Sequence, residues 1–254
     1  MKCYEILKEL NDIAPWKYAE EWDNVGLLVG SRTAEVKKVM LALEPSSEVI
    51  KQAIDTEVDM LITHHPLIFR GMKQVTGDDV IGRRVIGLIE NRIIYVAMHT
   101  NADAAFMSHY AAQKMHLKKK EILESKEYGA GVAGNLPEEI SAEECIALVK
   151  EVFDTEQVLF YGNQKKCVKR CAVLPGSGGD YIETALEKGA DIFITGDIKY
   201  HDAIAAVEQG MMIIDAGHFQ TEKIFVPIMK EKLKKSLPDL TILTASETAP
   251  YNII

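Results

Sequence analysis

The chain has 254 residues, of which 47% are apolar and 26% charged, and its formal net charge is −9. This composition is ordinary for a folded globular protein and excludes wholesale disorder, collagen-like fibres and low-complexity chains. No apolar run approaches the roughly 18 residues of a membrane span, and the acidic balance argues against nucleic-acid or membrane partners. At about 150 residues per domain, the length predicts one large domain or two small ones.

The cysteine pattern and the N-terminal segment predict a cellular location. The four cysteines form neither a zinc-ribbon spacing nor a dense disulfide framework. The N-terminal segment has an amphipathic helix pattern without the apolar core of a signal peptide. We therefore expect a cytoplasmic protein with reduced, structural cysteines.

Short apolar runs alternate with segments of helical period along the chain. Strands are predicted at 36–44, 59–63, 93–98, 168–174, 191–195 and 211–214, and helices at 48–56, 145–153 and 181–188. Ser46 or Ser47 can cap the first of these helices, Ser141 and Glu144 form a capping box before the second, and Gly189 ends the third. The strand runs are almost continuously apolar, as in strands covered on both faces, so the alternation predicts an α/β fold with parallel pairing.

An internal repeat indicates that this fold is duplicated. A shift of 132 positions aligns residues 36–65 with 168–197 without a gap, and the order of predicted elements matches. The identical pairs are Val36/Val168, Lys37/Lys169, Ile50/Ile182, Ala53/Ala185, Asp59/Asp191, Ile62/Ile194 and Thr63/Thr195. The glycine-rich stretch 129–137 is typical of a linker or tight loop. We therefore predict a first domain at 1–128, joined by the C-terminal segment 225–254, and a second at 129–224.

Polar groups follow the predicted strands, where ligands of parallel sheets bind. His64 and His65 follow the strand 59–63, the segment 99–103 follows 93–98, and Gly196-Asp197 follows 191–195. The segment 215–218 follows the strand 211–214, with Glu222 one turn later. Imidazole together with carboxylate suits zinc, iron or manganese, so the convergence of these groups predicts a metal site.

Each polar pattern also has an ordinary interpretation when it is taken alone. A His-His pair is common, a His-x-x-x-Glu pair often lies on a helix surface, and Asp197 and Asp215 fit turn or cap positions. His64 and His65 would point to opposite sides of a regular strand, but at a strand end each could reach a different ion. A carboxylate such as Asp103 or Glu222 can bridge two ions, as in hydrolytic metal pairs.

Together, the segments 22–30, 63–66, 99–103, 195–197, 201–203 and 215–218, with Glu222, resemble the NIF-three-like family. Its members are also described as GTP cyclohydrolase 1 type 2 homologs or dinuclear metal centre hexameric proteins. The resemblance runs in order through nearly the whole chain. It implies two similar α/β domains facing each other across a metal-binding cleft, two divalent metal ions per subunit and a ring-shaped homohexamer.

The resemblance also implies roles for individual residues. The implied metal ligands are His64, His65, Asp103, His218 and Glu222. His99 and His201 match nearby polar positions and are expected either to support the metal ligands or to transfer protons. The segment 22–30 is expected to be architectural, with a turn at Asp23-Asn24 and a short strand after it. The roughly 35 residues from His99 to Gly134 leave no room for the third domain that some relatives insert.

Three positions depart from the family pattern. Glu44 stands where an aspartate is usual, Val132 where relatives often carry arginine, and the segment 104–110 lacks the expected glycines. The implied ligand set is untouched. The loss of the arginine puts a shared contact to an anionic substrate in doubt.

Two functions fit these residues. The first is a metal-dependent hydrolase acting on a nucleotide such as GTP, with metal-activated water and proton transfer by His99 or His201. The loop 176–179 lacks the Lys-Thr of a P-loop, so phosphate would be held in other ways. The alternative is a non-enzymatic metal-handling or adaptor protein built on the hexameric ring. An open coordination position would favour hydrolysis, and a closed one metal handling.

Overall fold

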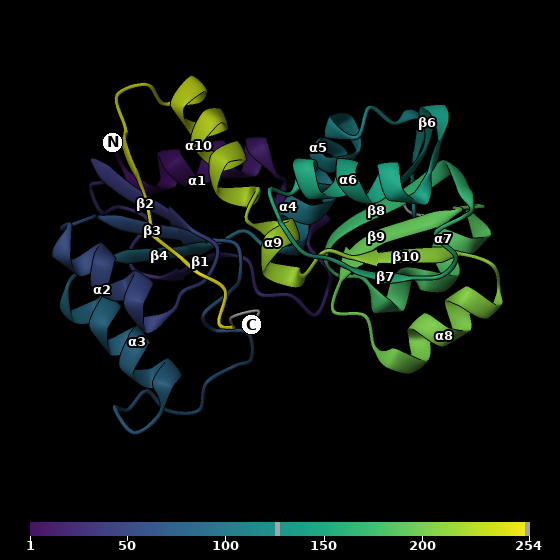
Figure 1. Cartoon of the computed structure of the whole chain (residues 1–254). Coiled ribbons are helices and arrows are strands. Elements are labelled where there is room, and N and C mark those ends of the chain that lie inside the picture. The colour runs from purple at the N-terminus through teal and green to yellow at the C-terminus, as the bar shows by residue number, and fades with distance from the viewer. Residues whose placement is uncertain (125–127, 252–254) are drawn as a thin grey trace. The chain divides into compact units, whose positions relative to one another are not determined.

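The computed structural model describes residues 1–124 and 128–251, and the chain divides into two compact units. Unit 1 consists of Met1–Ala102 with Phe225–Ile254, and unit 2 is Asp103–Ile224. Each unit contains one sheet with helices on both faces (Figure 1). The mixed α/β fold with two sheets is therefore confirmed.

Unit 1 is built on a five-stranded sheet of order β1-β4-β3-β2-β11. Strands β2, β3, β4 and β11 are parallel, and β1 pairs antiparallel with β4 at one edge. The strands are β1 (Gly26–Val29), β2 (Lys38–Ala42), β3 (Met60–Thr63), β4 (Ile94–Ala97) and β11 (Thr241–Thr244). Strands β2, β3 and β4 are almost entirely buried, which explains their continuous apolar sequence.

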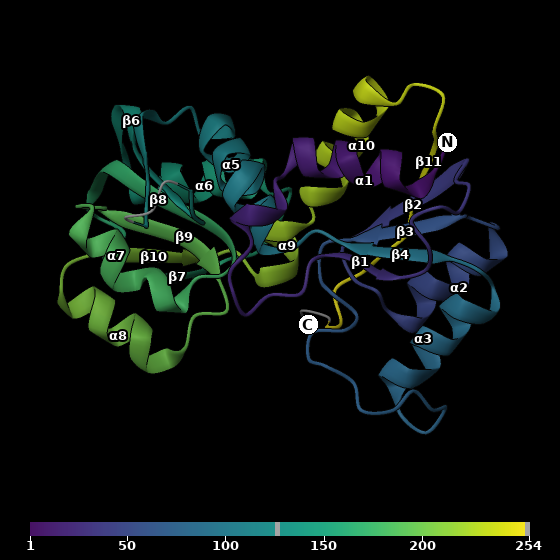
Figure 2. The same ribbon diagram turned by 180° about the vertical axis from the view of Figure 1, so that it is seen from behind.

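Helices cover both faces of this sheet. Helices α2 and α3 lie on one face, and α1 and α10 on the other (Figures 1 and 2). Their bounds are α1 (Cys3–Ile13), α2 (Ser47–Asp55), α3 (Val80–Glu90) and α10 (Phe225–Ser236), with the short turns η1 (Trp16–Tyr18) and α4 (Thr100–Ala102). The apolar sides of α2 and α3 pack on buried residues such as Met40, Leu61 and Tyr95 to form the core.

Unit 2 is built on a six-stranded sheet of order β5-β6-β8-β9-β10-β7. Strands β8, β9 and β10 are parallel, whereas β5, β6 and β7 pair antiparallel with their neighbours. The strands are β5 (Lys118–Ile122), β6 (Val132–Ser141), β7 (Leu159–Tyr161), β8 (Cys167–Ser177), β9 (Ile192–Gly196) and β10 (Met212–Asp215).

The helices of unit 2 follow the same layered plan. Helices α5 and α6 cover one face, and α7 and α8 the other (Figures 1 and 2). The elements are the π-helical η2 (Asp103–Met107), α5 (Ser108–Lys114), α6 (Ala142–Val152), η3 (Gly179–Tyr181), α7 (Ile182–Glu187), α8 (Tyr200–Glu208) and α9 (His218–Glu222). The fully buried Phe193 belongs to the core that α7 and α8 form with the sheet.

The predicted helix ends agree with the structure. The Ser46 hydroxyl accepts a hydrogen bond from the Val49 amide at 3.1 Å and caps α2. Ser141 and Glu144 form the capping box of α6, with hydrogen bonds of 3.2 and 2.8 Å. Gly189 follows α7 with φ of +67°, a left-handed conformation that suits glycine.

The duplication is visible in the order and pairing of the elements. In unit 1, β2, α2, β3, α3 and β4 succeed one another, and in unit 2, β8, α7, β9, α8 and β10 do the same. In each unit the three strands are parallel neighbours, and the third also pairs with an antiparallel edge strand. The units differ on the other side, where β11 is parallel to β2 but β6 is antiparallel to β8.

The predicted linker at 129–137 is wrong for most of its length. From Val132 onward these residues form β6, which pairs with both β5 and β8. Glycine suits position 134 inside this strand, because a Cβ there would lie 3.0 Å from the Lys118 carbonyl oxygen, which is a tight contact. Since β5 and β6 pair in one sheet, the segment 103–122 belongs to unit 2, and the division between units lies at Ala102/Asp103 instead of 128/129.

Within the described residues, no helix is both long and apolar enough to cross a membrane.

Candidate metal centre

The carboxyl ends of three parallel strands place the histidines of unit 1. Ala42 of β2, Thr63 of β3 and Ala97 of β4 stand in register, so the residues after them share one edge of the sheet. His64 and His65 follow β3 directly, and His99 comes two residues after β4. The end of the sheet therefore gathers side chains that are 35 positions apart in the sequence.

His64, His65 and His99 form a three-histidine cluster at this edge. One ligand nitrogen from each ring lies within 4.8 Å of the other two. Their ring centroids are separated by 4.9 Å for His64–His65, 5.2 Å for His64–His99 and 5.4 Å for His65–His99. His64 is fully buried, whereas His65 and His99 are partly exposed. Because β3 ends at Thr63, the consecutive histidines are not forced onto opposite faces, and their rings lie side by side.

Each ring of the three-histidine cluster is oriented through its Nδ1 atom. His64 Nδ1 lies 2.9 Å from the Met98 carbonyl oxygen, His65 Nδ1 2.6 Å from Glu44 Oε1, and His99 Nδ1 2.9 Å from Asp23 Oδ1. A carbonyl or carboxylate oxygen accepts, so Nδ1 carries the proton and Nε2 of the neutral ring carries the lone pair. This is the arrangement that metal-ligating histidines adopt in proteins.

Asp23 is the most strongly held of these partners. Its side chain is fully buried and also accepts a hydrogen bond from the Thr100 amide at 3.0 Å. Burial alone would raise the pKa of Asp23, but the hydrogen bonds and charge of His99 and the hydrogen bonds of Thr100 outweigh it and lower the pKa to about 2. Asp23 is therefore a fixed negative charge behind His99. The segment 22–30, expected to be architectural, thus also supplies a contact to the cluster.

Tyr95 holds the turn that carries His65. Its buried hydroxyl donates to the His65 carbonyl at 2.9 Å, accepts from the Leu67 amide at 2.8 Å and lies 2.6 Å from Thr63 Oγ1. Burial raises the pKa of Tyr95 well above its usual range, so the hydroxyl keeps its proton. Sequence analysis missed Tyr95, because a tyrosine within a buried apolar strand has no sequence pattern that distinguishes it from an ordinary core residue.

Glu247, beyond β11, supports the cluster from a distant part of the sequence. Its carboxylate accepts hydrogen bonds from the Leu43 and Glu44 amides at 2.7 and 2.8 Å. Burial raises the pKa of Glu247 despite these bonds. Glu44 in turn binds His65, so the C-terminal segment helps to fix the side chain that orients this ring. Glu44, noted as a departure from the family pattern, therefore orients the ring of His65.

Unit 2 presents a second donor set beyond β9 and β10. His218 Nε2 lies 2.9 Å from Glu222 Oε2 one turn along α9, and His218 Nδ1 lies 2.7 Å from Asp197 Oδ2. Asp215 accepts from the Gly217 and Ile198 amides at 2.9 Å each, which fixes the loops that carry these groups. The predicted helical pairing of His218 and Glu222 is thus present.

The Glu222 carboxylate is nearly buried and closely packed. A Cβ added at Gly176 would lie 2.1 Å from Glu222 Oε1, so only glycine fits beside the carboxylate. The Gly176 amide also donates to Thr221 Oγ1 at 2.8 Å, which ties α9 to β8. Asp103 begins the π-helical turn η2, and one of its oxygens lies within 4.8 Å of a Glu222 oxygen. Two carboxylates at this separation are suited to share cations.

The remaining predicted positions lie apart from these contacts. His201 is exposed on the first turn of α8, where its ring lies 5.3 Å from the Tyr200 ring centroid. Val132 is buried in β6 opposite Val173, so an apolar residue suits this position. The role of His201 stays a prediction.

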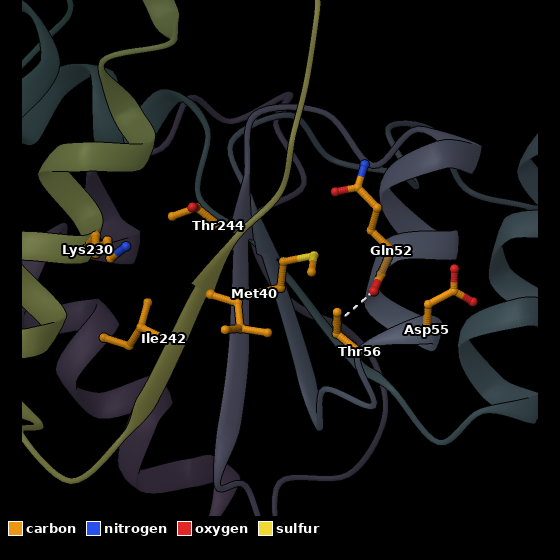
Figure 3. A pocket seen from close by; sticks show the side chains of 8 residues that line it. Met40, Gln52, Asp55, Thr56, Lys230, Ile242 and Thr244 are labelled. Atoms are coloured by element: carbon orange, nitrogen blue, oxygen red, sulfur yellow. Dashed lines mark hydrogen bonds between the residues drawn. The ribbon is translucent and has the colours of Figure 1, made fainter.

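A pocket of about 420 Å³ in unit 1 lacks comparable chemistry (Figure 3). Lys230 of α10 lies on one side, and Gln52, Asp55 and Thr56 from the end of α2 lie on the other. Asp55 is paired with Lys51, and the Thr56 hydroxyl donates to the Gln52 carbonyl at 2.6 Å. None of the predicted site residues lines this pocket, so the candidate site remains at the sheet ends.

The histidine and carboxylate groups at both sheet ends could hold a metal ion. Imidazoles with anchored Nδ1 atoms, whose Nε2 atoms carry a lone pair when the ring is neutral, form together with carboxylates a donor set for zinc, iron or manganese. His99, expected to transfer protons, lies within the same donor group as His64 and His65.

Comparisons with known proteins agree with this architecture. Residues 1–250 match the family model described as Duf34/NIF3 (NGG1p interacting factor 3). A GTP cyclohydrolase 1 type 2 homolog from Clostridium acetobutylicum is 34% identical, with 100% of this chain and 97% of the relative covered. Reduced HcgD from Methanocaldococcus jannaschii superposes with a TM-score of 0.88 at 34% identity, covering 97% and 98% of the two chains. Staphylococcus aureus protein SA1388 gives a TM-score of 0.89 at 28% identity, covering 100% and 99%.

Proposed function

This chain belongs to the Duf34/NIF3 family, and on that premise we propose that it binds two divalent metal ions and acts as a metal-dependent hydrolase. The proposed ligands are His64, His65, Asp103, His218 and Glu222. The observation that carries the proposal is the anchoring of each ring of the three-histidine cluster through Nδ1. Such anchoring leaves the lone pair of Nε2 oriented to bind a metal ion. An ordinary surface histidine has no need of this anchoring.

The donor chemistry fits this role. Two adjacent imidazoles in unit 1 and two carboxylates with an imidazole in unit 2 offer nitrogen and oxygen donors of the kind that zinc, iron and manganese share. A bridging carboxylate, for which Asp103 and Glu222 are the candidates, reduces the repulsion between two cations. When bound, the ions would supply a water molecule that ionises near neutral pH.

The chain's own side chains would position and transfer protons. Asp23 holds the Nδ1 proton of His99, so Nε2 can accept a proton while the Asp23 carboxylate stabilises the resulting imidazolium. His201 is a second proposed proton-transfer residue. His99, as the base, and Asp23, as the residue that orients it, are therefore already hydrogen-bonded to each other.

A nucleotide is the proposed substrate class. The support comes from curated relatives that carry the description GTP cyclohydrolase 1 type 2 homolog. A helix N-terminus, a metal ion or dispersed basic side chains would have to hold the phosphates. A substrate screen should therefore begin with GTP and extend to other nucleotides.

A non-enzymatic metal-handling or adaptor role is the second candidate. The burial of His64 and Glu222 favours it, because a deeply enclosed donor set suits retention of an ion more than rapid exchange of substrate. In this case metal would bind without turnover of any nucleotide.

Elemental analysis and a hydrolase screen on protein purified without added metal distinguish the two candidates. Two ions per chain with turnover support the hydrolase, and two ions without turnover support metal handling. His64→Ala should lose metal and turnover together, whereas the exposed His116→Asn should keep both. Unchanged metal content and hydrolysis in His64→Ala would refute the proposed site.

The proposed assembly is a ring-shaped homohexamer. Its support is the resemblance to proteins described as dinuclear metal centre hexameric proteins. Light scattering on the purified chain, with and without metal, would show six copies if the proposal holds. A monomer or dimer under both conditions would refute it.

A further inference from the structure

Two exposed aromatic side chains stand beside the three-histidine cluster. Trp22 is 59% exposed and Phe69 is 45% exposed, whereas Tyr95 and Phe225 in the same unit are fully buried. Their ring centroids lie 5.8 Å apart, and each ring also contacts His99, at 6.2 Å for Trp22 and 6.4 Å for Phe69. The His99 ring stands at a steep angle to both, 75° and 77°. A pair of large exposed rings in contact is an unusual use of apolar surface.

The segments that carry these rings are firmly held. Asn24 donates from its side chain to the Ile68 carbonyl, which ties the segment after Trp22 to the residue before Phe69. Asp23, next to Trp22 in the sequence, is held by His99 and Thr100. The rings are therefore pre-organised in their exposed positions, which lowers the conformational cost of binding a ligand.

Positive charge lies next to the aromatic pair. Phe69 also lines a pocket of about 410 Å³ whose wall includes Arg70 and Lys73. One carboxylate, Asp79, lines the same pocket, but it is engaged in capping α3 through the Gly82 amide at 2.8 Å. Phe69 thus contacts His99 and also lines the pocket that Arg70 and Lys73 border.

We infer that Trp22 and Phe69 form a stacking platform for a planar heteroaromatic ring, with Arg70 and Lys73 receiving an anionic substituent of the same molecule. Planar rings stack on aromatic side chains with useful affinity, and guanidinium and ammonium groups complement phosphate. This inference rests on the proposed function, because it assigns the proposed nucleotide a binding subsite next to His99. It requires no contact that lies outside unit 1.

Tryptophan fluorescence tests the platform directly. The chain has two tryptophans, so a Trp16→Phe background leaves Trp22 as the reporter. Zinc-loaded protein is titrated with GTP, with guanosine as the ring alone and with tripolyphosphate as the charge alone. We expect saturable quenching by GTP, weaker binding of guanosine and no quenching by tripolyphosphate.

Matched variants separate the platform from general effects. Phe69→Ala should weaken GTP binding about tenfold with unchanged metal content, and Arg70→Ala should weaken GTP but not guanosine. Tyr4→Ala, which removes another exposed ring from unit 1, should change nothing. Equal effects of Phe69→Ala and Tyr4→Ala would overturn the inference. So would a fluorescence shift that follows protein concentration without ligand, because the rings would then cover a contact between copies.

The outcomes also distinguish this inference from the proposed function. Loss of metal and turnover in His64→Ala with GTP binding retained at Trp22 supports the platform separately from the chemistry. Intact metal content and nucleotide hydrolysis with no Trp22 response refutes the platform and leaves the proposed function standing.

Discussion

Asp59 in unit 1 and Asp191 in unit 2 make the same hydrogen bonds at positions 132 residues apart. Asp59 Oδ2 accepts from the Lys37 and Lys38 amides at 2.7 and 2.9 Å, and Asp191 Oδ2 accepts from two amides, of Lys169 and Arg170, at 2.9 and 2.7 Å. Each aspartate thus ties the start of one central strand to its neighbour. The repeat found in the sequence is therefore a repeat of specific contacts as well as of strand order.

This equivalence predicts equal losses of stability. Asp59→Ala and Asp191→Ala each leave two backbone amides without their carboxylate, at a cost of about 1–2 kcal/mol, moderated by partial exposure. Urea unfolding followed by circular dichroism would measure both. Asp12→Ala on the exposed side of α1 is the control. A loss in only one of the two variants would show that the two contacts are not energetically equivalent.

The lowered pKa of Asp23 predicts how the free energy of unfolding of the metal-free protein depends on pH. Its folded-state pKa of about 2 lies below the ordinary value of 3.8, so the ionised carboxylate stabilises the fold above the ordinary value. That contribution, about 2 kcal/mol, is lost as the pH falls through the folded-state value. Wild type should thus exceed Asp23→Asn in stability at about pH 5, and the margin should shrink between about pH 4 and 2.

The control for this experiment is Asp239→Asn, which alters an exposed carboxylate of the same unit. It should follow wild type at every pH. A margin between wild type and Asp23→Asn that does not change with pH would mean that the charge of Asp23 is not what stabilises the fold.

Tyr95→Phe should damage both stability and metal binding. Removal of the hydroxyl leaves the buried Leu67 amide without its partner and the His65 carbonyl with the Thr63 hydroxyl as its remaining donor, at a cost of about 1–3 kcal/mol. Because the turn that carries His65 loses its support, metal content should fall as well. Thermal unfolding and elemental analysis would report the two effects. The exposed Tyr4→Phe should leave both unchanged, and normal metal content in Tyr95→Phe would contradict the positioning role.

Gly176→Ala should displace the side chain of Glu222 although no proposed ligand is itself substituted. Gly176 and Gly189 both have positive φ, +82° and +67°, so alanine is strained at either position. Only at Gly176 would the new Cβ meet Glu222 Oε1, at 2.1 Å, whereas nothing lies within 4 Å at Gly189. Both variants should lose about 1 kcal/mol of stability, but Gly176→Ala alone should lose metal in elemental analysis. Equal metal content in the two variants would show that Gly176 is not required to hold Glu222 in a metal-binding position.

The sequence predicted the contacts that depend on local pattern. The continuous apolar strands, the cap at Ser46 and the capping box at Ser141 all follow from neighbouring residues, and the repeat supplied the order of strands. The segment after Gly131 was misjudged because glycines were taken as loop signals, although Gly134 serves the close approach of two strands. Residues from 132 onward form a strand because β6 pairs with β5 and β8, and such pairing cannot be read from neighbouring residues.

The supports of the candidate site could not be predicted in the same way. Asp23 and His99 are 76 residues apart, and Glu247 and Leu43 are 204 apart. The sequence spacing of neither pair predicts a contact, because only the order of strands in the sheet brings the two residues of each pair together. The histidines could be recognised from their positions after strands, whereas the groups that orient them required the structure.

Unit 1 is discontinuous in sequence, and this has a consequence for the order of events during synthesis. The strands that the structure describes in unit 2 have been made by residue 215, whereas the sheet of unit 1 lacks β11 until residue 244. Because domains fold as units during translation, unit 2 can fold while unit 1 is still incomplete. Glu247 is made later still, so the ring of His65 acquires its full support only after residue 247 has been synthesised. The three-histidine cluster therefore gains its last support after the strands of unit 2 have been made.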